Sequence, residues 1–223
     1  MDTYHYKLTA KHVLHGKWKN AILVTFIAAL LGGVLSGANV NLTLNLDADD
    51  LRYLPDFVVT YLRTVAPIAL FMALAQMILG GVVQLGYCGY LLKLYDGENA
   101  ELGDLFSEMD RFIEGFCLSF LRGLFVGLWT MLFIIPGIIA TYRYAMSPFI
   151  LYENPHKSAL DAINESKEIM DGRKMDLFIL HFSFIGWILL AALTLGIGDL
   201  WLNPYMSMTE ACFYRSLCPK KLS

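Results

Sequence analysis

Residues 115–152 read GFCLSFLRGLFVGLWTMLFIIPGIIATYRYAMSPFILY, with only two charged side chains, Arg122 and Arg143. As one helix, these 38 residues would be about 57 Å long, whereas about 20 apolar residues suffice to cross a membrane. Pro136 followed by Gly137 is a strong break signal in the middle of this stretch. We therefore predict two membrane-crossing helices, with a hinge at Pro136 and Gly137.

The composition of the whole chain agrees with a membrane protein. Of its 223 residues, 57% are hydrophobic and 17% are charged, whereas soluble domains contain about 45–50% apolar and about 25% charged residues. A soluble core of this size could not bury so much apolar surface, so lipid must solvate much of it. The net charge of −3 argues against a nucleic-acid binder.

Other charge-poor stretches divide in the same way. The stretch from Leu177 onward is interrupted by glycines at 196 and 198 and then by Pro204. We predict an all-α fold, a polytopic membrane helix bundle that forms a single domain over 1–223. The six predicted spans cover about 20–40, 65–92, 115–135, 138–152, 177–197 and 199–217.

The distribution of basic residues predicts the orientation, because cytoplasmic loops carry an excess of lysine and arginine. With the N-terminus inside, six spans place thirteen basic residues in the cytoplasm and only Arg52 and Arg63 outside. A model with four spans would instead place the basic residues between Lys157 and Lys174 outside the cell. We therefore expect six spans and two cytoplasmic termini.

The connecting segments also carry local signals. Residues 1–19 are predicted to form a basic amphipathic segment on the inner membrane surface, ending near Trp18. Ser158 and Asp161 have the spacing of a capping box, and Gly172 is placed to end the helix that follows. Leu160, Ile163 and Met170 would share one face of that helix.

No recognisable catalytic motif is present. The chain lacks the phosphate-binding glycine motifs and HExxH, and its four cysteines form no CxxC pair, so we expect no cofactor and no metal site. His181, Asp199 and Glu210 could form an acid–base set. On six straight spans, however, roughly 24 Å of helix rise separates His181 from Asp199. We expect a protein that is not an enzyme.

Charges inside predicted spans are costly and need an explanation. Arg143 lies between Tyr142 and Tyr144, where it either binds an anionic headgroup or ligand or extends to the membrane surface. Arg122 and Glu210 lie at similar predicted depths, about 10 Å from the inner face, and are predicted to form a structural ion pair.

Several short motifs occur together in one order along the chain. They are IIPGI at 134–138, the group Tyr142, Arg143 and Tyr144, Gly172-Arg173-Lys174, Trp187, TLGIG at 194–198, and Pro204-Tyr205. In these motifs the chain resembles the bacterial integral membrane proteins called domain of unknown function 975, found mainly in Gram-positive species. The resemblance covers nearly the whole chain and implies a multi-pass protein of the bacterial cytoplasmic membrane, without supplying an activity.

Two functions remain open besides an enzyme. The first is a non-enzymatic membrane module, an accessory or scaffold protein that binds membrane lipid, other membrane proteins or a second copy of itself. The alternative is a small transporter or export factor for a lipophilic or amphipathic solute, because transporters often build their sites where helices are broken.

Overall fold

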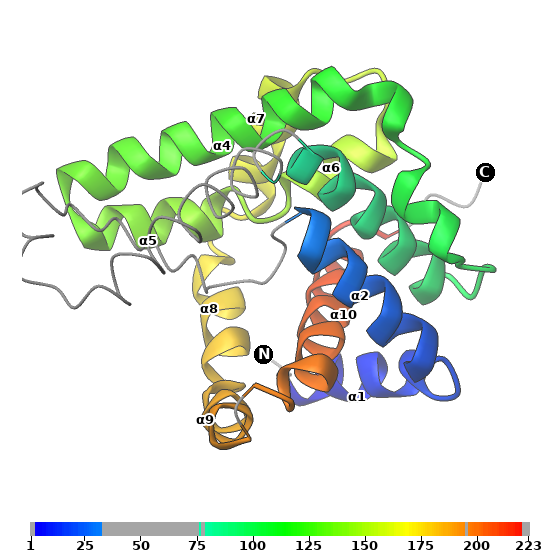
Figure 1. Cartoon of the computed structure of the whole chain (residues 1–223). Coiled ribbons are helices and arrows are strands. Elements are labelled where there is room, and N and C mark those ends of the chain that lie inside the picture. The colour runs from blue at the N-terminus through cyan, green and yellow to red at the C-terminus, as the bar shows by residue number, and fades with distance from the viewer. Residues whose placement is uncertain (1–2, 33–75, 77–78, 195, 220–223) are drawn as a thin grey trace, which may run out of the picture.

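The computed structural model describes residues 3–32, 76, 79–194 and 196–219, and every regular element among them is a helix. This confirms the all-α prediction for the described part of the chain. One helix without a label in Figure 1 covers 79–95. The other elements are α1 (Thr3–Leu14), α2 (Trp18–Gly32), η2 (Leu102–Phe106), η3 (Met109–Arg111), α4 (Phe112–Leu132), α5 (Ile134–Arg143), α6 (Ser147–Glu153), α7 (Ala159–Ile169), α8 (Lys174–Phe182), α9 (Ile185–Leu193) and α10 (Asp199–Leu217).

Among the described residues, three helical stretches are long and apolar enough to cross a membrane: Leu102–Leu132, Ile134–Glu153 and Lys174–Leu193. They contain the predicted spans 115–135, 138–152 and 177–197 almost completely. The last predicted span, 199–217, coincides with α10 but is not among the three. The predicted spans 20–40 and 65–92 lie partly outside the described residues, and α2 is a shorter apolar helix.

The break near Pro136 is present, but the chain turns slightly earlier than predicted. Phe133 separates α4 from α5 with an extended backbone (φ −157°, ψ 145°), and the two helices lie side by side (Figure 1). Pro136 sits in the first turn of α5, where the missing N–H costs no hydrogen bond. Gly137 is buried, and a Cβ there would lie 2.1 Å from Oγ1 of Thr130. Gly137 therefore lets α5 pack closely against α4.

The α4–α5 hairpin projects from the rest of the molecule and runs across the direction of α8 and α10 (Figure 1). The helices therefore do not share one axis, in contrast to a simple bundle. Apolar side chains at the tip are open to the surroundings, with Met131 89% and Ile134 72% exposed. An exposed apolar surface of this kind is typical of contact with lipid or with a protein partner.

The core is built around α10, which packs against α1, α2 and α9. Met208, Ala211 and Phe213 of this helix are completely buried. The helix over 79–95 approaches α4 so closely that a Cβ on Gly81 would lie 2.1 Å from the carbonyl oxygen of Gly115. A small residue is therefore required at this crossing of two helices.

The local signals around α7 are partly confirmed. Ser158 and Asp161 form the predicted capping box at the start of α7, and Gly172 ends the segment in the left-handed region (φ +72°). Ile163 and Met170 are buried, whereas Leu160 is 48% exposed, so only part of the predicted apolar face packs against the rest of the protein.

Candidate binding cavity and its surroundings

The structure separates the three residues of the predicted anionic site. Arg143 is exposed, whereas Tyr144 is buried against Phe125 of α4. Tyr142 faces α8, with its ring centroid 5.6 Å from that of His181. The two tyrosines thus pack in different places and do not enclose Arg143 in one pocket.

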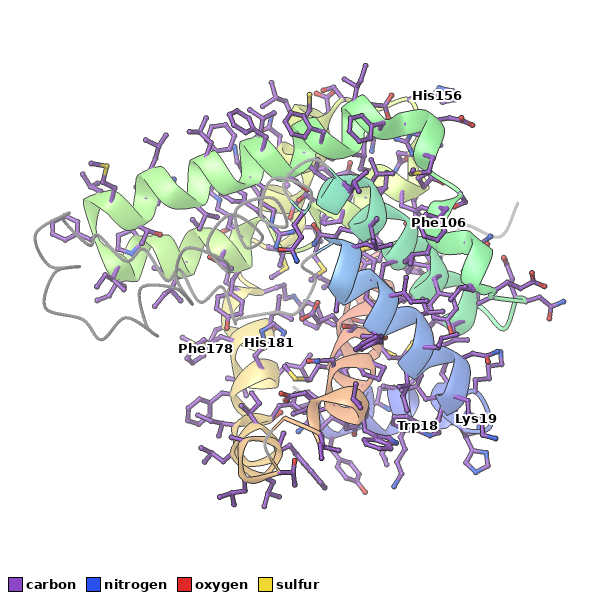
Figure 2. The ribbon with its side chains drawn as sticks, viewed as in Figure 1. Trp18, Lys19, Phe106, His156, Phe178 and His181 are labelled. Atoms are coloured by element: carbon purple, nitrogen blue, oxygen red, sulfur yellow. The ribbon has the colours of Figure 1, made fainter. Side chains whose placement is uncertain are left out.

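Glu210 has a partner that the sequence did not predict. Its Oε1 lies 2.8 Å from Nε2 of His181, which joins α10 to α8. Figure 2 shows His181 on the side of α8 that faces α10. No ion pair within 4 Å joins Glu210 to Arg122 among the described residues, although the two charges interact electrostatically. Within the described part of the chain, the side chain that contacts the Glu210 carboxylate is therefore a histidine.

Several helices meet around Glu210. Its partner His181 also lies against Tyr142 of α5, with 5.6 Å between the two ring centroids. Polar groups are expensive inside an apolar environment unless they find partners. The contact between His181 of α8 and Glu210 of α10 satisfies two such groups that lie 29 positions apart in the sequence.

A second polar cluster holds the ends of three segments together. Arg215 of α10 forms ion pairs with Glu153 of α6 and with Asp96, which follows the helix over 79–95. The Oη of Tyr214 donates a hydrogen bond to Glu153 over 2.6 Å. The side chain of Arg215 is only 5% exposed. This cluster stabilises the fold and leaves no open space for a ligand at the guanidinium.

A half-open cavity lies between α1, α2, α9 and α10 and has a volume of about 430 Å³; two of its tryptophans, Trp187 and Trp201, are themselves exposed. This volume is within the usual range of roughly 300–1,000 Å³ for small-molecule sites. Its wall is mostly apolar and rich in aromatic rings. The lining residues are Lys11, Trp18, Trp187, Leu190, Ala191, Thr194, Gly198, Trp201, Leu202 and Tyr205.

Two polar groups in the wall already have partners. The hydroxyl of Thr194 donates to the carbonyl of Ala191 and accepts from the N–H of Gly198. The hydroxyl of Tyr205 donates to the carbonyl of Lys7 over 3.2 Å. These bonds use the polar atoms within the protein, so the surface offered to a ligand by these residues is mainly apolar.

Lys7 fixes one side of the cavity without lining it. Its ammonium donates to the carbonyl of Ser183 over 2.9 Å and lies 3.9 Å from the centre of the Phe184 ring. Burial lowers the pKa of Lys7 below its ordinary value. Together with Tyr205, this side chain ties α1 to the junction of α8 and α9 and to α10.

Sequence reasoning did not find this cavity, although part of its signal is in the sequence. Three of the four tryptophans line it, and Trp18 starts α2 beside Lys19, as Figure 2 marks. Tryptophans near span ends are also expected at any membrane surface. Only the packing of α9 and α10 against α1 distinguishes a cavity wall from a general interfacial belt.

No group of three or more metal-binding side chains occurs among the residues that the structure describes. The four cysteines are free thiols. The candidate sites of the described residues therefore stay the cavity and the two polar clusters around Glu210 and Arg215.

Comparison with known proteins places the chain in a family. No curated protein and no solved structure matches it. A family model described as "Protein of unknown function (DUF975)" matches residues 1–141 and 130–221, which together cover nearly the whole chain. The chain therefore belongs to the DUF975 family.

Proposed function

We propose that this protein is a non-enzymatic integral membrane module that binds lipid in the aromatic cavity between α1, α2, α9 and α10. The observation that carries the proposal is the cavity itself, about 430 Å³ in volume and walled by three tryptophans and Tyr205. Aromatic and aliphatic walls suit a hydrocarbon chain, because they exclude water without demanding hydrogen bonds from the ligand.

The proposed location is the bacterial cytoplasmic membrane, with several crossings and both termini in the cytoplasm. Three described stretches are suited to cross a membrane, and the exposed apolar tip of the α4–α5 hairpin supports contact with lipid. The distribution of basic residues supports a cytoplasmic α1. Six crossings would place Gly198 outside and Lys11 inside, but both line the same cavity, so we propose that the end of α9 lies with α1 on the cytoplasmic side and that the cavity opens there.

Native mass spectrometry of the protein in a mild non-ionic detergent tests lipid binding. We expect the purified protein to retain lipid, and Trp201→Ala to lose most of it because a wall of the cavity is removed. Trp129→Ala is the matched control, since Trp129 belongs to α4 and does not line the cavity. Equal lipid retention by both variants, or none by the unmodified protein, would refute the proposal.

Cysteine labelling tests the proposed topology. In a variant without the four native cysteines, we expect Ile134→Cys at the tip of the α4–α5 hairpin to react with an impermeant maleimide from outside and Glu168→Cys to react only after permeabilisation. Both positions are exposed in the structure, so packing does not block the reagent. External labelling at position 168 would contradict two crossings of the membrane between residues 112 and 153.

The polar contacts of Glu210 favour a second candidate function, the export of an amphipathic solute. A polar pair between two helices, close to the break at Ser183, is an arrangement that transporters use. We expect efflux of a fluorescent amphipathic dye from proteoliposomes to be lost in Glu210→Gln. Efflux equal to that of empty liposomes in the unmodified protein would exclude this function for the dye.

A further inference from the structure

One face of α1 presents two lysines to the neighbouring helices, and their environments differ. Lys7 and Lys11 are four positions apart, so they lie one above the other on the helix. The ammonium of Lys7 already has two partners, because it donates a hydrogen bond to the Ser183 carbonyl and lies over the Phe184 ring. Lys11 lines the cavity, and its ammonium has no hydrogen-bond or ion-pair partner within the described part of the chain.

The surroundings of Lys11 are basic. Residues 3–19 carry four lysines and three histidines and no acidic residue. No aspartate or glutamate occurs among the described residues that line the cavity. A negatively charged group at this end would therefore meet an attractive potential and no carboxylate to repel it.

The rest of the cavity favours a ligand of a particular size and polarity. Beyond Lys11, the lining offers tryptophan rings, aliphatic side chains and hydroxyls whose hydrogen bonds are already made. The volume of about 430 Å³ is near the lower end of the range for ligand cavities, which favours one hydrocarbon chain over two. The site thus combines one cationic end with an apolar interior.

We propose that the ligand is a single-chain anionic amphiphile, whose chain lies among the tryptophans and whose carboxylate or phosphate meets the ammonium of Lys11. This inference rests on the proposed lipid-binding function and specifies its ligand class. Lys11 is exposed, so water screens the ion pair and its contribution to affinity is modest. We expect loss of this ammonium to weaken binding about fivefold, which corresponds to about 1 kcal/mol.

Tryptophan fluorescence tests the proposal, because bromine atoms quench nearby indoles. In a Trp129→Phe background, the three remaining tryptophans all line the cavity. The detergent-solubilised protein is titrated at pH 8 with 9,10-dibromostearate, with the corresponding dibromostearyl alcohol, and with a lysophosphatidic acid that carries the same dibrominated chain. Only quenching that unbrominated stearate reverses is counted as binding in the cavity.

We expect one or both acids to bind more tightly than the alcohol, and the tighter acid identifies the headgroup. Lys11→Gln should weaken binding of that acid about fivefold and leave the alcohol unchanged, whereas Lys11→Arg should retain most of the affinity. Lys19→Gln is the control, since Lys19 is a neighbouring lysine outside the lining. Equal, reversible binding of acids and alcohol, unaffected by Lys11→Gln, would overturn the anionic preference while preserving lipid binding. Absence of reversible quenching by all three would overturn both proposals.

Discussion

Arg215 provides a stringent test of how the helix ends are held together. Its guanidinium lies between Asp96 and Glu153, and Tyr214 donates a further hydrogen bond to Glu153. Arg215→Met retains much of the aliphatic stem but removes the cation. Glu153, whose side chain is 25% exposed, would keep the Tyr214 hydroxyl and lose its ion-pair partner.

The expected loss follows from this burial. Removing one member of a buried ion pair costs about 3–5 kcal/mol, and we take the lower figure because Glu153 is partly exposed and retains one hydrogen bond. For a chain of this length, about 3 kcal/mol lowers the melting temperature by roughly 6–12 °C. Tyr214→Phe removes a single hydrogen bond to a charged group and should cost about 1.5 kcal/mol.

Thermal unfolding in detergent, followed by circular dichroism at one detergent concentration, measures these losses. Arg143→Met is the matched control, because Arg143 is exposed and has no side-chain partner among the described residues. Its melting temperature should change by no more than about 2 °C. If Arg215→Met and Arg143→Met unfold at the same temperature, the argument that the Arg215 cluster stabilises the fold is refuted.

Two further predictions concern pH and pairing. Hydrogen bonds from Ser158 hold the pKa of Asp161 below its ordinary value. The difference in unfolding free energy between the unmodified protein and Asp161→Asn, measured by urea unfolding, should therefore be full at neutral pH and shrink as the pH falls below about 4. A difference that grows on acidification would contradict the capping role. A double-mutant cycle should give His181→Gln and Glu210→Gln a coupling of about 1 kcal/mol. The cycle of Arg122→Gln with Glu210→Gln should give less, because those side chains share no contact within 4 Å among the described residues; a larger coupling there would restore the predicted ion pair.

The places where sequence reasoning succeeded depend on neighbours along the chain. The capping box at Ser158 and the turn at Gly172 involve atoms only a few residues apart, so their residue types predict them directly. The division of residues 115–152 was predicted for the same reason. The exact turn at Phe133 was missed, because Pro136 can begin a helix as well as end one.

The partners of the charged residues could not be predicted in this way. Depth arithmetic paired Glu210 with Arg122 by assuming straight spans with a common axis. The α4–α5 hairpin instead runs across the direction of α8 and α10 (Figure 1), and the side chain in contact with Glu210 is His181. Two charges at equal depth can face each other when all the helices are parallel. When the helices cross, the same two charges can lie apart.

The sequence by itself determined that the chain is helical, that it is too apolar to be an ordinary soluble domain, and that residues 115–152 divide near Pro136. These properties follow from composition and from interactions between residues within about four positions of each other. Tertiary structure alone decided that Arg215 joins three segments and that Lys11 faces three tryptophans across a cavity. Such contacts depend on how α10 packs against α1, α2 and α9. Side-chain packing between segments that are distant in the sequence cannot be predicted from the pattern of neighbouring residues.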